Sequence, residues 1–184
     1  MTVTLTNKKW TLSARPETSV SKEHFNLETE TVRELVDGEF LVKNQYLAFE
    51  PAQRGWLNDV RSYLPPVAIG EVMRSGAAGE VIASKHSDYQ VGDLVQGSFG
   101  WQEYAISDGT GLFPVTKIPA GIPISYPLHI FGLTGLTAYF GLLDLGLPKA
   151  GETVLISGAA GATGSTVGQI AKLLGCRVIG IAGG

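Results

Sequence analysis

Residues 157–168 read SGAAGATGSTVG, and this glycine-rich stretch decides the fold of the second part of the chain. It follows the apolar run ETVLI (152–156) and precedes the helix-like run QIAKLLG (169–175). A second apolar run, CRVIGIAG (176–183), comes next, so the order is strand, glycine turn, helix, strand. This is the order of a β-α-β unit. Both predicted strands are almost continuously apolar, which is typical of parallel strands covered on two faces.

The small residues of the turn have the spacing that a bound pyrophosphate requires. Their core is Ala159-x-Gly161-x-x-Gly164, with alanine at the first position of the usual G-x-G-x-x-G. We expect Gly161 to let a phosphate approach the backbone and Gly164 to let the helix pack against the strand. The N–H groups of residues 161–165 then face the ligand, and the helix dipole favours its negative charge. The predicted cofactor contacts in this turn are Ala160, Gly161, Ala162, Thr163, Gly164 and Ser165.

A glycine-rich turn without a ligand is the alternative interpretation, whereas a P-loop is excluded because no Gly-Lys-Ser/Thr follows. In the usual fingerprint an acidic residue about 20 positions after the last glycine binds the ribose hydroxyls of NAD. Position 184 is glycine, and no acid occurs near it. Because a carboxylate there would repel a 2′-phosphate, its absence favours NADP over NAD.

The first 120 residues predict short strands separated by glycine turns, which is typical of a small antiparallel barrel. Residues 54–67 are expected to form a loop, because Pro65 and Pro66 exclude a helix there. A proline-rich connector (117–127) precedes a helical segment (128–146). We therefore expect two domains, 1–125 and 126–184. The candidate strands of the first are 3–15, 29–35, 38–51, 70–73, 79–84, 94–99 and 101–107.

Composition excludes several classes of function. The net charge is −3 and no basic block occurs, which argues against nucleic acid and anionic membranes as partners. The single cysteine, Cys176, cannot form a disulfide within the chain or a Cys-based zinc site. Neither a signal peptide nor a membrane-spanning run is evident, so the cytoplasm is the expected location.

Three blocks of sequence resemble the NADP-dependent branch of the zinc-free medium-chain dehydrogenase/reductases, which includes curcumin, alkenal and prostaglandin reductases. The blocks are residues 49–97, 100–107 (GWQEYAIS) and 132–184. The resemblance implies a GroES-like antiparallel barrel followed by the first β-α-β of a Rossmann domain, with NADP as cofactor and no metal. It also implies hydride transfer to the β-carbon of an enone or enal, with a proton added at the α-carbon.

The same resemblance implies that the intact protein is a homodimer about twice this length, so that the chain is an N-terminal fragment, inactive alone. A quinone oxidoreductase of the same fold and a non-catalytic, truncated binding module are the alternatives. The proton donor and any other catalytic residue are not identified from the sequence.

The resemblance also suggests four contacts outside the turn. Gly135 and Thr137, in GLTAY, are expected near the nicotinamide, and Tyr63 and Arg54 near the substrate. The alternatives are a Thr137 bonded to its own helix, a Tyr63 packed on prolines and an ordinary loop arginine. Ala52 stands where the family often has a tyrosine that faces the substrate, which leaves open how an enolate would be stabilised.

Overall fold

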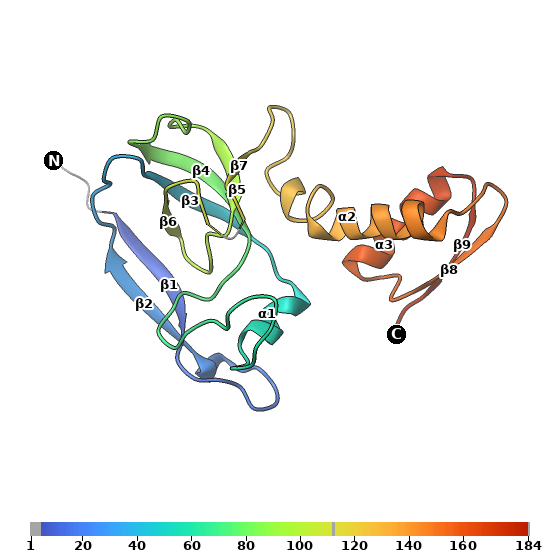
Figure 1. Ribbon diagram of the computed structural model, residues 1–184, viewed down its shortest axis with the longest axis horizontal. Helices are drawn as coiled ribbons and strands as arrows, with labels where there is room; N and C mark the ends of the chain where they lie inside the picture. The colour runs from blue at the N-terminus through green and yellow to red at the C-terminus, as the bar shows by residue number, and fades with distance from the viewer. Residues whose placement is uncertain (1–4, 112, 184) are drawn as a thin grey trace. The chain divides into compact units, whose positions relative to one another are not determined.

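The computed structural model describes residues 5–111 and 113–183. The chain divides into two compact units, the first ending at Ile124 and the second beginning at Ser125 (Figure 1). The strand pairs described in the first unit are all antiparallel, and the second unit is an α/β unit.

In the first unit, a long hairpin joins β1 (Thr6–Leu12) to β2 (Phe25–Thr31), with a 3₁₀ turn (Lys22–His24) between them. A five-stranded sheet has the order β6-β3-β4-β5-β7 (Figure 1). Isolated bridges from Lys9 to Gln102 and from Thr11 to Val72 tie the hairpin to the rest of the unit. This architecture confirms the predicted GroES-like antiparallel barrel. The strands of the sheet are β3 (Phe40–Leu47), β4 (Ala77–Ser84), β5 (Leu94–Gly97), β6 (Tyr104–Ser107) and β7 (Thr116–Lys117).

Two hydrophobic clusters hold the first unit together. The barrel cluster includes Phe40, Val81 and Val95, all fully buried. The second cluster lies under the hairpin and includes Leu12, Trp56, Leu57, Leu64, Val67 and Met73. Burying side chains of this size stabilises a fold by about 1.5–3 kcal/mol each.

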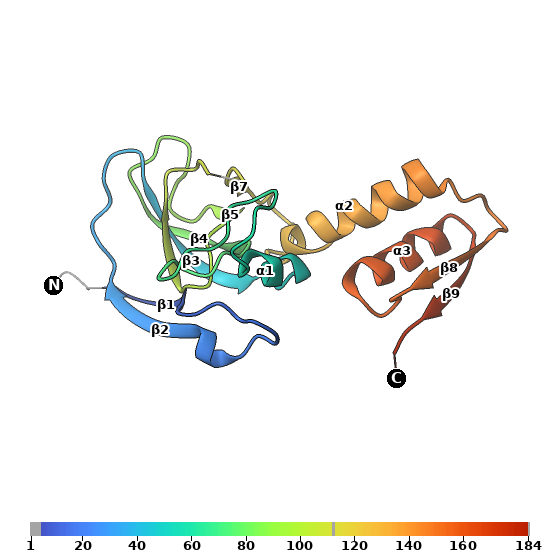
Figure 2. The ribbon, with the colours of Figure 1, turned by 60° about the horizontal axis from the view of Figure 1, so that its bottom comes forward.

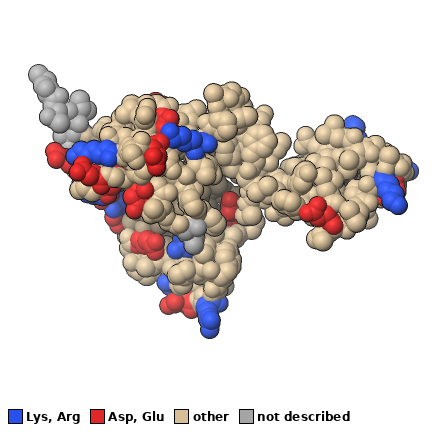
Figure 3. Space-filling view, turned by 45° about the horizontal axis from the view of Figure 1, so that its top comes forward, with Lys and Arg blue, Asp and Glu red and all other residues tan. Residues whose placement is uncertain are grey.

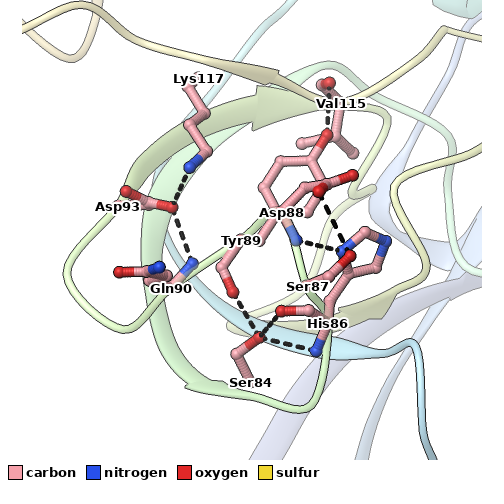
Figure 4. A network of polar contacts seen from close by, with 9 residues as sticks. All are labelled: Ser84, His86, Ser87, Asp88, Tyr89, Gln90, Asp93, Val115 and Lys117. Atoms are coloured by element: carbon pink, nitrogen blue, oxygen red, sulfur yellow. Dashed lines mark hydrogen bonds and ion pairs between the residues drawn. The ribbon is translucent and has the colours of Figure 1, made fainter.

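A polar network fixes the connection between β4 and β5 to the sheet (Figure 4). The Ser84 hydroxyl donates to the Tyr89 carbonyl and accepts from the His86 N–H at 3.0 Å. The Tyr89 hydroxyl donates to the Val115 carbonyl at 2.8 Å, and its ring stacks on Phe40 with a 4.2 Å centroid separation. The Lys117 ammonium pairs with the Asp93 carboxylate at 2.7 Å. The backbone N–H of Gln90, and then Lys117, lower the pKa of Asp93.

The structure corrects the expected boundaries around Pro51. The predicted strand 38–51 ends at Leu47, and Pro51 begins a short helix, α1 (Pro51–Trp56), which runs into the start of the loop expected at 54–67. Proline favours the first helical position, because its fixed φ suits a helix and its missing N–H is not needed there. Residues 70–73 form a single bridge at Val72, not a strand of the sheet. The expected strand at 29–35 lies at Phe25–Thr31.

The second unit contains two helices and two parallel strands. A 3₁₀ turn (Tyr126–Leu128) leads to α2 (Leu133–Phe140), which continues as a π-helical segment (Gly141–Gly146). The parallel pair β8 (Thr153–Ser157) and β9 (Arg177–Ile181) is connected by α3 (Ala162–Leu173). This confirms the predicted first β-α-β of a Rossmann domain.

Helix α3 lies between α2 and the two strands (Figure 2). Its residues Val167, Ile170 and Ala171 pack in the core of the unit with Leu142 and Cys176. Leu174, which the helical spacing also predicts on this face, follows the end of the helix and is exposed. Among the described residues, no helix is long and apolar enough to cross a bilayer.

Candidate functional site

The turn after β8 depends on a glycine that the sequence motif does not single out. Gly158 has φ +61°, a left-handed conformation that glycine adopts without a steric penalty. Two hydrogen bonds then hold the turn. The Ala159 N–H donates to the Ile181 carbonyl at the end of β9 at 3.0 Å, and the Gly161 N–H donates to the Gly158 carbonyl at 2.9 Å. The position of this glycine directly after an apolar strand is the signal that could have identified it.

Gly164 is the position where a side chain is least compatible with the turn. A Cβ there would overlap the Gly158 carbonyl oxygen and lie 3.0 Å from the Ala159 Cα. A Cβ on Gly161 would lie 3.1 Å from the same carbonyl oxygen. The missing side chains at 161 and 164 therefore allow the start of α3 to lie against the turn formed by Gly158 and Ala159.

The N-terminus of α3 presents unpaired backbone donors. The N–H groups of Ala162, Thr163 and Gly164 lie in the first turn, where no helical carbonyl is available to them. The predicted run of donors, 161–165, is too long at both ends. Gly161 donates to the Gly158 carbonyl, and the Ser165 N–H donates to the Gly161 carbonyl at 2.9 Å.

No side chain in the described turn competes for these donors. Gly161 is the N-cap, and the Ser165 hydroxyl donates to the Ala162 carbonyl at 3.1 Å. No acidic residue lies in the first turn of α3. Residues 160–163 and Ser165 are exposed. Exposed N–H groups at the positive end of a helix, together with the close approach at Gly164, fit a phosphate group.

Gly135 and Thr137 both have a role inside the second unit. Gly135 is buried, and a Cβ there would overlap the Ile130 carbonyl oxygen. The Thr137 hydroxyl donates to the Leu133 carbonyl in its own helix at 2.7 Å. Gly135 therefore allows close packing, and the Thr137 hydroxyl bonds to its own helix, as the alternative interpretation states. A contact of either residue with a cofactor stays a prediction.

In the first unit, Arg54 is held by acceptors of the protein itself. Its guanidinium donates to the Asn58 Oδ1 at 2.6 Å and to the carbonyls of Pro16 at 3.3 Å and Thr18 at 2.9 Å. It thereby fastens the loop after β1 to α1. These bonds use three of the five guanidinium donors, and a contact of Arg54 with a substrate or phosphate stays a prediction.

Tyr63 is placed differently, because its side chain is 72% exposed. Its oxygen accepts the Nε1–H of Trp56 at 3.0 Å, a partner that the sequence did not reveal. Among the described residues, no acceptor for the hydroxyl hydrogen of Tyr63 is found, so the phenol is anchored and still able to donate. Ala52 lies one helical turn before Trp56 on the same face of α1 and packs against the second cluster.

Within the described part of the chain, no group of three or more His, Cys, Asp or Glu side chains is placed to hold a metal ion. Cys176 is buried, and its Sγ contacts the Lys149 carbonyl at 3.3 Å. On the face shown in Figure 3, basic and acidic side chains alternate over the first unit without a continuous basic area.

Comparison with known proteins identifies relatives along nearly the whole chain. Residues 8–115 match the model of the N-terminal domain of oxidoreductase. The chain is 46% identical to the NADPH-dependent curcumin reductase of Escherichia coli, over 97% of this chain and 51% of that protein. It is 41% identical to mouse prostaglandin reductase 1, over 96% of this chain and 52% of that protein. The chain thus spans about half the length of the curated relatives it matches.

A solved structure agrees with these relatives. CurA from Vibrio vulnificus, crystallised in complex with NADPH, superposes with a TM-score of 0.84 at 46% identity, over 96% of this chain and 52% of that one. The family model covers more than half of the chain, and the antiparallel fold of the first unit agrees with it. The chain therefore belongs to the medium-chain dehydrogenase/reductases, in the NADP-dependent branch that holds the curcumin, prostaglandin and alkenal reductases.

Proposed function

We propose that this chain provides the barrel and the pyrophosphate-binding turn of an NADPH-dependent reductase that acts on the C=C bond of α,β-unsaturated carbonyl compounds. The observation that carries the proposal is the start of α3, where exposed N–H groups follow a turn closed by glycines. The names of the relatives, which are NADPH-dependent curcumin, prostaglandin and 2-alkenal reductases, support this cofactor and substrate class. The resemblance further supports a cytoplasmic homodimer for the intact protein.

On the cofactor side, the residues that would hold the pyrophosphate are Ala162, Thr163 and Gly164, through their N–H groups. Gly161 keeps the approach open, and Ala160 and Ser165 flank it. Gly135 and Thr137 complete the proposed contacts on α2. When bound, NADPH supplies the hydride that is added to the β-carbon of the substrate.

On the substrate side, we propose that the Tyr63 hydroxyl donates a hydrogen bond to the carbonyl oxygen of the substrate. Negative charge develops on this oxygen as the enolate forms, and a fixed hydrogen-bond donor stabilises it. The Trp56 N–H holds the phenol oxygen in place and makes its hydrogen a stronger donor. Tyr63 would thus replace the tyrosine that is absent at Ala52. Arg54 supports this region by fixing α1.

A hybrid enzyme tests the proposal. The chain is joined to the remaining C-terminal part of the E. coli curcumin reductase, and NADPH oxidation is measured with an enal and with a quinone. We expect turnover of the enal, and none from the C-terminal part alone or from the Gly164→Val hybrid. Turnover of the quinone but not the enal would replace the proposed reaction by the quinone alternative. A folded hybrid that binds no NADPH would refute the enzyme assignment.

The isolated chain is expected to bind NADPH weakly and to have negligible activity, because β8 and β9 are the only described strands of its Rossmann unit. Titration with NADPH, followed through the amide resonances of Ala162 to Gly164, measures this binding. Micromolar affinity would contradict the expectation.

A further inference from the structure

A hollow of about 370 Å³ opens on the first unit between the β1–β2 hairpin and the end of β3. Its volume lies within the range of small-molecule pockets, about 300–1,000 Å³. None of the residues in the proposed cofactor or substrate contacts lines it. Four aromatic rings form most of its wall, and the complete lining is Trp10, Val20, Ser21, Lys22, Phe25, Leu47, Phe49 and Trp101.

Contacts within the protein hold the aromatic wall in place. The Trp101 ring contacts two phenyl rings, with its centroid 5.3 Å from that of Phe25 and 5.4 Å from that of Phe49. Phe25 and Trp101 also pack against the second cluster, which fixes their positions. Phe49 is 76% exposed, so a large apolar surface remains in contact with water. A flat ring inserted beside Phe49 would cover this surface and gain offset or edge contacts with the wall.

The positive charge of Lys22, at the edge of the hollow, favours an anionic ligand over a cationic one. The Lys22 ammonium lies 5.9 Å from the centroid of the Trp10 ring, and no ion pair among the described residues includes it. The neighbouring Glu23 carboxylate accepts from the Ser21 hydroxyl at 2.6 Å. A cationic ligand would therefore meet a like charge over Trp10, whereas an anionic group would meet its counter-ion.

From these observations we infer that the hollow is a binding site for a planar aromatic carboxylate, with the ring against Phe49 and Trp101 and the carboxylate at Lys22. The site is separate from the proposed reductase chemistry and does not depend on it.

The three tryptophans of the chain allow the position of the ligand to be read directly. Naphthalene-2-carboxylate is titrated into the 184-residue chain, and the three indole N–H resonances are followed by NMR. Trp10 and Trp101 line the hollow, whereas Trp56 does not. We expect the resonances of Trp10 and Trp101 to shift with one dissociation constant while that of Trp56 stays unchanged. An absence of saturable shifts, or a shift of Trp56 alone, would overturn the inference.

Variants test the two parts of the site separately. Phe49→Ala, at an exposed position, is expected to weaken binding about tenfold, whereas Phe113→Ala, at an exposed aromatic outside the hollow, should leave it unchanged. Lys22→Gln is expected to weaken the carboxylate about threefold and to leave naphthalene-2-carboxamide unaffected, as for an exposed ion pair. Equal binding of acid and amide to the wild-type chain would refute the charge preference. Equal binding to wild type and Phe49→Ala would refute the aromatic site.

Discussion

Replacement of Gly164 by alanine tests the geometry of the glycine turn most directly. The added Cβ would overlap the Gly158 carbonyl oxygen, which belongs to the backbone and cannot turn away like a flexible side chain. Such overpacking costs about 1–3 kcal/mol, and we take the upper end because the obstacle is backbone. Alanine recovers up to about 1 kcal/mol of helix propensity. The net expectation is that the second unit is destabilised by about 2 kcal/mol.

Gly168→Ala is the matched control within the same helix. A Cβ there would lie 3.5 Å from the Ile156 Cδ1 and 3.6 Å from the Val178 Cγ1, which are ordinary contacts. The same chemical change should therefore stabilise the second unit by up to about 1 kcal/mol, as alanine does in a helix interior. The two alanine variants should differ by about 3 kcal/mol.

The assay must report the second unit alone. Trp10, Trp56 and Trp101 all lie in the first unit, so their fluorescence does not follow the second. Native-state hydrogen exchange of the amides in β8, β9 and α3 measures local opening of the relevant unit. Gly164→Ala should raise the exchange rates there about thirtyfold, while amides of β3 and β4 remain unchanged. If Gly164→Ala and Gly168→Ala protect these amides equally, the close approach at Gly164 is wrong.

Three further predictions concern the first unit. In the hybrid enzyme, Tyr63→Phe should lower kcat about 100-fold with a smaller change in KM, because it removes one donor to the developing oxyanion; an unchanged kcat in steady-state assays would remove Tyr63 from the proposal. Arg54→Met should destabilise the first unit by about 1–3 kcal/mol, because three acceptors lose a charged donor. Urea unfolding followed by tryptophan fluorescence measures this loss, and the affinity of the hybrid enzyme for NADPH should not change. Glu39 accepts two hydrogen bonds from Arg33 and one from the Val36 N–H, and these contacts lower its pKa from 4.5 to about 2. Its contribution to stability is therefore present above about pH 4.5 and is lost as pH falls toward 2, so the urea midpoint of wild type should fall over this window more than that of Glu39→Gln.

The β-α-β unit could be predicted from sequence because its constraints are local. Apolar strands, small residues in the turn and the helical spacing of Val167, Ile170 and Ala171 all lie within one short segment. The left-handed conformation of Gly158 follows from the direction in which the chain leaves β8, which a pattern of glycine spacing does not contain. Proline can end a strand and can also begin a helix, so the local sequence does not distinguish the two at Pro51, and in the structure it begins α1.

The roles of Arg54 and Tyr63 could not be predicted from the sequence and depend on the structure. Arg54 and Tyr63 are both polar residues on the same surface segment, and the sequence offered no basis for separating them. Their hydrogen-bond partners distinguish them, because Arg54 reaches the carbonyls of Pro16 and Thr18, whereas the hydrogen bond found for Tyr63 among the described residues is with the indole of Trp56. The Arg54 guanidinium gives three of its five donors to internal acceptors, so we expect it mainly to stabilise the fold. The Tyr63 oxygen accepts a hydrogen bond, and its hydroxyl hydrogen can still be donated to a ligand. The loss of Arg54 should therefore appear in unfolding measurements and the loss of Tyr63 in turnover, and a reversal of that division would contradict the assignment of both residues.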